Sequence, residues 1–195
     1  CGVSYTVSVD SLRDDALAAN VKTFVLEPGN EEIHKDDLLF REVCRIVTPA
    51  FQAHGYTIVE DRKDADGVAR ISYWSENPRQ EVRTDYVTRS VPVAVNRGRY
   101  SFIDYVYVDE PTLVAYTVYT ARLCIEASTL KGTERQIWRT LYSYSDTRDD
   151  FRGMLANMAP AIPRGLASQT HGMKRLLVEI SEDGLVTVTD PELGR

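Results

Sequence analysis

The feature that most constrains the fold is an alternation of apolar and polar residues running from Tyr86 to Tyr144. Four stretches keep this period of two, namely Tyr86 to Val95, Arg99 to Val108, Thr112 to Ser128 and Gln136 to Tyr144. Turn-forming residues separate them at Asn96-Arg97-Gly98, Asp109-Glu110-Pro111 and Lys131-Gly132. A period of two places alternate side chains on opposite faces of a strand, and short turns join antiparallel strands. This region therefore predicts an antiparallel meander.

The residues before the meander change between strand and helix patterns. Val21 to Leu26 is rich in β-branched and aromatic residues and ends at a turn, which predicts a core strand. Residues 37–54 carry apolar side chains three and four positions apart, with Pro49 inside the pattern and Gly55 after it. We expect a helix that bends at the proline and stops at the glycine. Two more strands are expected at Tyr56 to Glu60 and Gly67 to Trp74.

The two ends of the chain complete the fold prediction. Tyr5, Val7 and Val9 alternate with polar residues, as in a short half-buried strand. Residues 149–159 return to helical spacing, and a hairpin is expected from Met173 to Thr189. Each helix has one apolar stripe, which an alternating sheet face can cover. The sequence predicts an α+β fold, in which a largely antiparallel mixed sheet carries two main helices packed on one face.

Cys1 suggests how the chain is held in its compartment. A cysteine at a processed bacterial N-terminus resembles the product of the lipoprotein pathway, in which the thiol takes a diacylglycerol and the freed amine is acylated. Two or three acyl chains, such as palmitate, give stable membrane anchoring. Gly2 is similar to the pattern that directs lipoproteins to the outer membrane. We expect lipidation of Cys1 and a domain facing the periplasm, the alternative being an arbitrary chain boundary.

Size and composition indicate the domain organisation. The chain has 195 residues, and its 43% apolar and 27% charged residues are close to the globular norm. We expect a lipid-anchor tether and short N-terminal segment at residues 1–20. A single globular α+β domain is expected at residues 21–195.

Charge and hydropathy exclude two classes of interaction. The net charge of −6 gives the protein no general attraction for the phosphate backbone of nucleic acids. The longest near-apolar stretch, Val91 to Val95, is far shorter than the roughly 20 residues of a membrane-spanning helix. We expect no nucleic-acid partner, and contact with the membrane only through the lipid on Cys1.

The other two cysteines leave two interpretations open. Cys44 lies on the apolar face of the predicted helix, and Cys124 lies inside a predicted strand. Both fit buried thiols that behave as small apolar side chains. They could instead form a disulfide in an oxidising periplasm, provided that their Cα atoms lie within about 7 Å.

Motifs of catalysis and metal binding are absent from the sequence. His34, His54 and His171 stand apart, without His-x-x-x-His or Cys-x-x-Cys spacing. No nucleophile elbow, phosphate-binding loop or dinucleotide fingerprint occurs. The acidic turn from Asp61 to Asp66 lacks EF-hand spacing and is typical of solvated turns. We predict no metal, no cofactor and no enzymatic activity.

Aromatic residues on the predicted strands indicate an interaction surface. The chain has 11 tyrosines, most of which we expect to pack on half-buried strand faces. Exposed tyrosine and tryptophan beside arginine are also typical of protein interfaces. We single out Tyr105, Tyr107 and Trp74 as candidate interface residues.

Several segments together resemble a known family. They are Lys22 to Leu26, Asp37 to Val43, Gly55 to Val59, Ala65 to Ile71 and Ile137 to Arg139. These segments are similar to the bacterial envelope lipoproteins classed as domain of unknown function 4136. Gly67 replaces an aliphatic residue that is usual there, and the long hairpin from Tyr86 to Val108 also departs from the family. The resemblance implies a lipid-anchored periplasmic domain, and the family supplies no established catalytic residues.

Three function classes remain after these exclusions. The first is a non-enzymatic envelope protein that binds another protein or stabilises an assembly. The second is a small-ligand or lipid-binding module, which requires an apolar pocket between the helices and the sheet. The third is an enzyme with an unrecognised site, for which the Asp61 to Asp66 turn, His54 and His171 are the first residues to test.

Overall fold

The computed structural model describes residues 1–192. Its helices and strands are β1 (Val3–Arg13), α1 (Asp15–Ala18), β2 (Thr23–Pro28), α2 (Leu38–Ala53), β3 (Thr57–Val59), β4 (Gly67–Ser75), β5 (Arg79–Arg97), β6 (Tyr100–Thr129), β7 (Gln136–Asp146), α3 (Phe151–Met158), α4 (Ile162–Gly165), β8 (Lys174–Ile180) and β9 (Val186–Thr189), with short 3₁₀ turns at Arg62–Asp64 and Ala159–Ala161. The chain divides into two compact units, one formed by residues 1–77 with the chain from Tyr119 onward, the other by Pro78–Val118.

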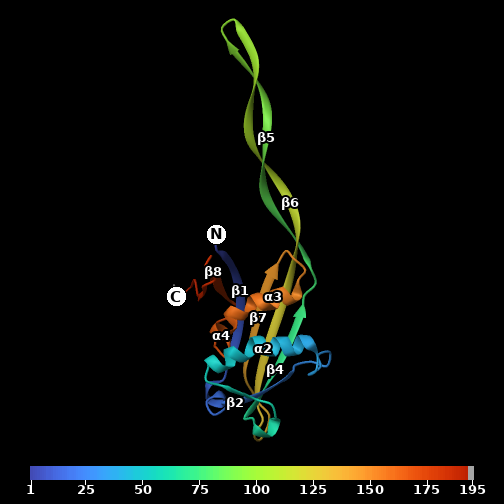
Figure 1. Cartoon of the computed structure of the whole chain (residues 1–195), viewed down its shortest axis with the longest axis vertical. Helices are drawn as coiled ribbons and strands as arrows, with labels where there is room; N and C mark the ends of the chain where they lie inside the picture. Colours follow the sequence, from blue (N-terminus) through green and yellow to red (C-terminus); the bar gives the residue numbers. More distant parts are fainter. Residues whose placement is uncertain (193–195) are drawn as a thin grey trace. The chain divides into compact units, whose positions relative to one another are not determined.

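The larger unit is built on a mixed sheet. Its strands follow the order β3-β2-β4-β6-β7-β1-β8-β9. β2 runs parallel to β3 and β4, and the other neighbouring strands pair antiparallel. The helices α2 and α3 lie on the same face of this sheet (Figure 1). The predicted α+β class, with a largely antiparallel sheet and two main helices on one face, is confirmed.

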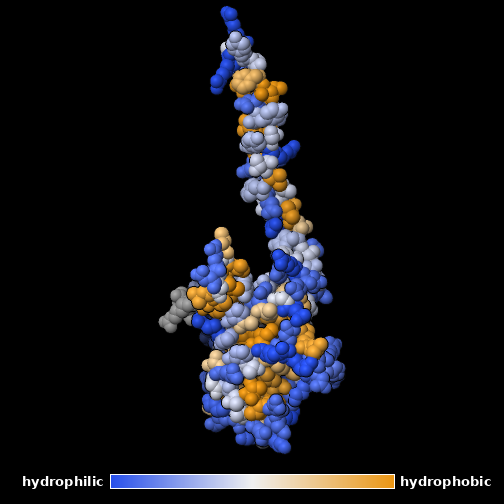
Figure 2. All heavy atoms as spheres, in the orientation of Figure 1, coloured by the Kyte–Doolittle hydropathy of each residue, from blue (hydrophilic) through white to orange (hydrophobic). Residues whose placement is uncertain are grey.

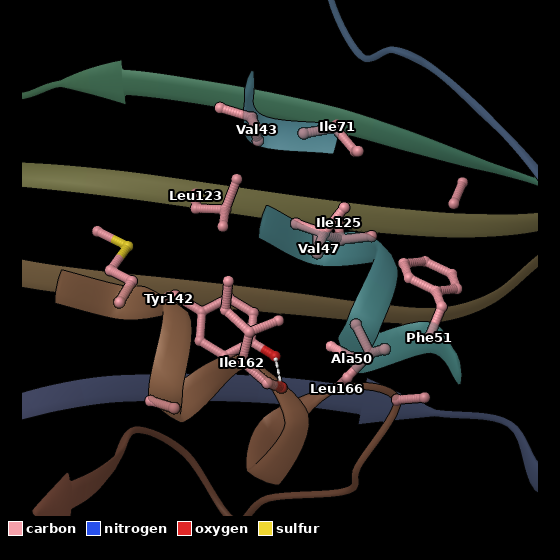
Figure 3. Packing of buried hydrophobic residues seen from close by; sticks show 14 of the residues in the cluster. Val43, Val47, Ala50, Phe51, Ile71, Leu123, Ile125, Tyr142, Ile162 and Leu166 are labelled. Carbon is pink, nitrogen blue, oxygen red and sulfur yellow. Dashed lines mark hydrogen bonds between the residues drawn. The ribbon is translucent and has the colours of Figure 1, made fainter. Parts of the chain in front are cut away.

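The main core lies between α2 and the sheet. The buried side chains of α2 recur at three- and four-residue steps, and they are Phe40, Val43, Val47, Ala50 and Phe51. They meet Ile71, Leu123 and Ile125, which alternate with outward residues along β4 and β6 (Figure 3). Each such aliphatic side chain contributes about 1.5 to 3 kcal/mol when fully buried. Gly55 ends the helix region at a positive φ of 79°, as the sequence predicts.

A buried tyrosine joins the second helical region to the sheet. Tyr142 on β7 is fully buried, and its hydroxyl donates a hydrogen bond of 2.6 Å to the carbonyl oxygen of Ile162 (Figure 3). Gly165 lies so close to Val9 and Tyr142 that a Cβ atom there would stand 2.6 Å from a Val9 methyl carbon. α4 is therefore fixed against the sheet at both ends, by the hydrogen bond at Ile162 and the close approach at Gly165.

The smaller unit is a two-stranded antiparallel ribbon, which we call the ribbon (Figure 1). β5 pairs with the first part of β6 from Arg79 opposite Val118 to Arg97 opposite Tyr100. The loop Gly98-Arg99 connects the strands, and Gly98 has a φ of 65°, as the first loop residue of a type II′ hairpin requires. No side chain from residue 78 to residue 117 is buried. Neither face of the ribbon is therefore buried.

The domain organisation differs from the expected tether at residues 1–20 and single domain at residues 21–195. β1 pairs with both β7 and β8, and its Val7 and Val9 are buried in the core. The N-terminal segment thus belongs to the sheet. The ribbon forms a second unit because its alternating residues, unlike those of β1, have no covered face.

The turn predicted at Asp109-Glu110-Pro111 is wrong, because β6 continues through it. Beside a two-residue loop the closing pair, Arg97 with Tyr100, is hydrogen-bonded, and the pairs then alternate along the ribbon. Pro111 opposite Tyr86 falls in a non-hydrogen-bonded pair. Its nitrogen faces the free edge there, so the proline removes no hydrogen bond between the two strands.

Candidate functional site

The ribbon has two faces of different composition. The face that we call the valine face carries the odd-numbered residues of β5 and the even-numbered residues of β6. Its valine and phenylalanine members are Val87, Val91, Val93, Val95, Phe102, Val106, Val108, Val114 and Val118. The opposite face, which we call the tyrosine face, has the exposed large side chains Val82, Tyr86, Ile103, Tyr105, Tyr107 and Leu113. Figure 2 shows hydrophobic patches interrupted by hydrophilic ones along the ribbon. Both faces therefore present apolar surface.

Charged residues at the start of the ribbon are paired with one another. Arg79 pairs with Glu81 and Arg83 with Asp85 along β5, while Arg89 reaches Glu110 across the strands. The hydroxyl of Tyr116 donates a hydrogen bond of 3.0 Å to Glu81. Hydrogen bonds from Arg79 and Tyr116 lower the pKa of the Glu81 carboxyl. Exposed pairs of this kind stabilise a protein little, so they do not replace a core.

The ribbon exposes apolar side chains that its own fold does not cover. An isolated two-stranded hairpin is marginally stable in water, because neither face buries apolar area. Exposed apolar patches on a folded protein mark interaction sites. The ribbon is therefore the candidate functional site.

The predicted interface aromatics fall in different units. Tyr105 and Tyr107 lie two residues apart on the tyrosine face and are 61% and 75% exposed. Trp74 lies on β4 of the larger unit and is 39% exposed. Its neighbour Tyr73 packs against Phe151 of α3, so Trp74 points to the sheet face opposite the helices. The structure places only the two tyrosines together.

The valine face was not predicted from the sequence. Its valines alternate between Val87 and Val95, a pattern that also describes a strand with one side in a core. The length of the two stretches, which a single short turn at Gly98 joins, could have indicated this exposed face. The faces of a hairpin of that length are larger than the two predicted helices can cover.

Cys1, the predicted lipidation site, is exposed. Its amino group forms an ion pair with Glu182, which lies between β8 and β9. Strand β1 begins at Val3, so Gly2 alone separates the cysteine from the sheet. A lipid on Cys1 would accordingly be attached directly beside the sheet.

The disulfide considered for Cys44 and Cys124 is not formed, since both are free thiols. Cys44 packs against the core from α2. Leu123 and Ile125 point into that core, so Cys124 between them points to the other face of the sheet. Burial raises the pKa of each thiol to about 11, which leaves both protonated and weakly nucleophilic at neutral pH.

The residues considered first for an enzyme have structural contacts. Lys131 and the backbone N–H groups of Lys22 and Thr23 hold the pKa of Asp66 at about 2, because all of them favour the charged carboxylate. His54 lies with its Nε2 atom 2.7 Å from the carbonyl oxygen of Pro163 and stacks on Tyr56. His171 is exposed on a loop. These groups do not form a shared site.

Residues 1–192 contain neither a metal-binding cluster nor a membrane-spanning helix. Within residues 1–192, no group of three His, Cys, Asp or Glu residues is arranged to hold a metal ion. The same part of the chain has no helix that is long and apolar enough to cross a membrane.

A cleft of about 750 Å³ lies beside α2 in the larger unit. Its lining includes the apolar side chains Phe40, Cys44 and Ile58 and the charged side chains Lys35 and Arg41. Its size falls within the range of small-molecule sites. It is the feature that a ligand-binding function would use.

Comparison with known proteins gives a fold likeness only. No family model and no curated protein matches the chain. Among solved structures, it is similar to a PDZ domain protein from Parabacteroides distasonis, with a TM-score of 0.51 and 13% sequence identity. The similarity covers 91% of this chain but only 39% of that one. The resemblance to envelope lipoproteins thus stays a prediction.

Proposed function

We propose that this protein is a lipid-anchored component of the bacterial cell envelope that binds another envelope protein without catalysing a reaction. In this proposal Cys1 holds it at the outer membrane, the folded part faces the periplasm, and the tyrosine face of the ribbon contacts the partner. The observation that carries the proposal is the exposure of Tyr105 and Tyr107 on a ribbon that has no buried face.

Tyrosine suits such a surface for physical reasons. Its ring supplies a large apolar contact area, and its hydroxyl finds a hydrogen-bond partner once the ring is covered. Interfaces concentrate their binding energy in a few tyrosine, tryptophan and arginine side chains. A partner that covers Tyr105 and Tyr107 would also give the ribbon the buried face that it lacks alone.

Photo-cross-linking in intact cells of the native host tests this proposal. A photoreactive amino acid at Tyr107 should give one specific protein product, whereas the same group at Gln52, exposed on α2, should not. Tyr105→Ser combined with a photoreactive group at Tyr107 should reduce that product strongly. Products of equal yield from both positions, or no product from Tyr107, would contradict the proposal.

Fractionation tests the anchor separately. Cys1→Ser should remove the protein from the membrane fraction and should also remove the diacylglyceryl mass from the intact protein. Serine lacks the thiolate that accepts the lipid. The fold should be retained, because Cys1 is exposed and precedes β1. Equal membrane association of wild type and variant would exclude the anchor.

The cleft beside α2 supports one alternative, a small-ligand or lipid-binding module. Saturable binding of a fluorescent fatty acid to the purified protein would favour it. Thr48→Trp should block that binding, because Thr48 lines the cleft. Binding that is unaffected by this change would place the fatty acid elsewhere.

A further inference from the structure

The closed end of the ribbon, residues 94–103, which we call the tip, carries a local positive charge. Arg97 belongs to the closing pair of the two strands, and Arg99 lies in the loop. Both are exposed, and neither makes an ion pair within residues 1–192. No acidic residue occurs between Arg89 and Asp104. The tip is therefore positive on a chain whose net charge is −6.

Apolar side chains lie beside these arginines on both faces of the ribbon. Tyr100, Phe102 and Ile103 are all exposed. Phe102 lies opposite Val95 on the valine face, whereas Ile103 lies opposite Ala94 on the tyrosine face. Figure 2 shows hydrophilic residues at the end of the ribbon and hydrophobic residues next to them. The tip thus combines positive charge with apolar surface on two opposite sides.

This arrangement fits a medium that surrounds the tip better than a partner that covers one face. A protein docked on one face would leave the apolar side chains of the other face in water. The interfacial region of a bilayer contacts both faces at once, and aromatic rings such as tyrosine are enriched at that level. Arginine keeps its stem on apolar surface there while its guanidinium pairs with a phosphate.

We propose that the tip inserts into the headgroup region of a bilayer that contains anionic phospholipids. The proposal goes beyond the proposed function, because it requires neither a protein partner nor the lipid on Cys1. Arg97 and Arg99 pair with lipid phosphates, and the apolar side chains of the tip are covered by the headgroups. The negative surface of such a bilayer repels the net charge of the chain, so attachment depends on the local charge of the tip.

The free edges of the ribbon limit the depth of insertion. Each strand has N–H and C=O groups that its partner strand does not bond, and hydrocarbon cannot satisfy them. Interfacial segments lie about 5 to 10 Å deep, which corresponds to about three residue pairs at about 3.4 Å per residue. Asp104 pairs with Val93, four pairs behind the pair of Arg97 and Tyr100 and so about 14 Å away. Its carboxylate therefore stays outside the headgroups.

Vesicle sedimentation tests the proposal. The purified full chain carries Cys1→Ser, so that no acyl chain can contribute to binding. At low ionic strength it should sediment with vesicles of equal parts phosphatidylglycerol and phosphatidylcholine, and it should stay in the supernatant with vesicles of phosphatidylcholine alone. Added salt should release it, because ions screen the attraction between the arginines and the lipid surface.

Charge variants test the role of the two arginines. Arg97→Gln combined with Arg99→Gln should lower the vesicle partition coefficient about 30-fold, since each basic side chain near an anionic surface adds about 1 kcal/mol. Arg135→Gln combined with Arg148→Gln is the matched control. These exposed arginines of the larger unit make no ion pair within residues 1–192, so their loss changes the net charge equally and should leave binding nearly unchanged.

Apolar variants test insertion rather than adsorption by charge alone. Phe102→Ser combined with Ile103→Ser should lower the partition coefficient at least about tenfold, because both side chains lose apolar area that the headgroups would cover. Val82→Ser combined with Leu113→Ser is the control. Both residues are exposed on the tyrosine face outside the tip, and their replacement should have little effect.

An environment-sensitive fluorophore reports which part of the ribbon meets the lipid. Attached at Ser101→Cys in the tip, it should shift its emission to shorter wavelength when anionic vesicles are added. Attached at Thr84→Cys, on the same face but far from the loop, it should not shift. The natural thiols Cys44 and Cys124 are protected by burial.

The proposal is overturned by equal sedimentation with anionic and neutral vesicles, by no sedimentation with either, by unchanged binding of either tip variant, or by a shift at Thr84→Cys without one at Ser101→Cys. Unfolding curves of each variant check that the larger unit is intact. The vesicles contain no protein, so failure here leaves the photo-cross-link at Tyr107 as a separate test of the proposed function.

Discussion

Strand β6 passes through both units, and its two parts show how differently one pattern can be used. In the larger unit, Leu123 and Ile125 of β6 are buried in the core, while Arg122 and Glu126 point to the other face of the sheet and are only partly buried. In the ribbon, Phe102 and Ile103 are both exposed, although they point to opposite faces. Alternation therefore specifies a strand, whereas burial depends on whether another layer covers one face.

The apolar side chains of the two units contribute differently to the stability of the fold. The core cluster of the larger unit contains no residue from Pro78 to Val118. Apolar side chains in that core stabilise the fold, while those of the ribbon remain available to a partner. Our central claim is that the fold carries the ribbon but does not require it.

The largest contrast is expected between two phenylalanines. Phe51→Ala should lower the free energy of unfolding by about 3 to 5 kcal/mol, because it leaves a cavity beneath α2. Phe102→Ala, a change of the same size on the ribbon, should cost less than about 0.5 kcal/mol. Urea unfolding followed by the fluorescence of the buried Trp138 measures both. Equal losses would show that the ribbon is part of the cooperative core.

A smaller contrast is expected between two tyrosines. Tyr142→Phe removes the hydroxyl that donates to the Ile162 carbonyl and leaves that buried oxygen without this bond. The backbone N–H of Leu166 still donates a hydrogen bond to that oxygen, so we expect a loss of about 0.5 to 1.5 kcal/mol. Tyr107→Phe removes an exposed hydroxyl and should leave the unfolding midpoint unchanged. A midpoint shift of similar size in both variants would contradict the division between the units.

Asp66 gives a pH-dependent effect confined to the larger unit. Its pKa is about 2 in the folded protein, below the ordinary value of 3.8, so the folded state favours the carboxylate. This contribution is fully present above about pH 4 and is lost as the pH falls through 2. Asp66→Asn should therefore cost about 1 to 2 kcal/mol at pH 7, a figure reduced for solvent screening, and the cost should shrink towards pH 2.

Unfolding of wild type and Asp66→Asn across this pH range measures the difference. Asp109→Asn on the ribbon is the control and should match wild type throughout. A cost for Asp66→Asn that stays constant from pH 7 to pH 2 would mean that the hydrogen bonds of Asp66 do not depend on its charge.

Local sequence patterns predicted the elements well. The spacing of Phe40, Val47 and Phe51 defines one face of α2, and Gly55 marks its end, because both properties depend on residues close in sequence. The alternation in β6 and β7 identified the strands for the same reason.

The remaining features depend on contacts between distant residues. Asp109-Glu110-Pro111 has turn chemistry, but the register set at Gly98 places the proline where the ribbon tolerates it. Cys44 and Cys124 both fit buried positions, and only the sheet shows that they lie on opposite faces. Trp74 and Tyr105 both lie on predicted strands, and the alternation of the strands does not show that the two residues belong to different units.

Removal of the ribbon tests whether the larger unit folds without it. Replacing residues 78–118 by Asn-Gly would leave a four-residue loop of Asn77, the inserted Asn-Gly and Tyr119. This loop is closed by Glu76 and Thr120, because the backbone N–H of Glu76 already donates a hydrogen bond to the carbonyl oxygen of Thr120. The quantity to measure is the free energy of unfolding of this shortened chain in urea. We expect a value within about 0.5 kcal/mol of wild type, as for surface changes that leave the core intact. Failure to fold, or a loss above about 2 kcal/mol, would show that the fold requires the ribbon.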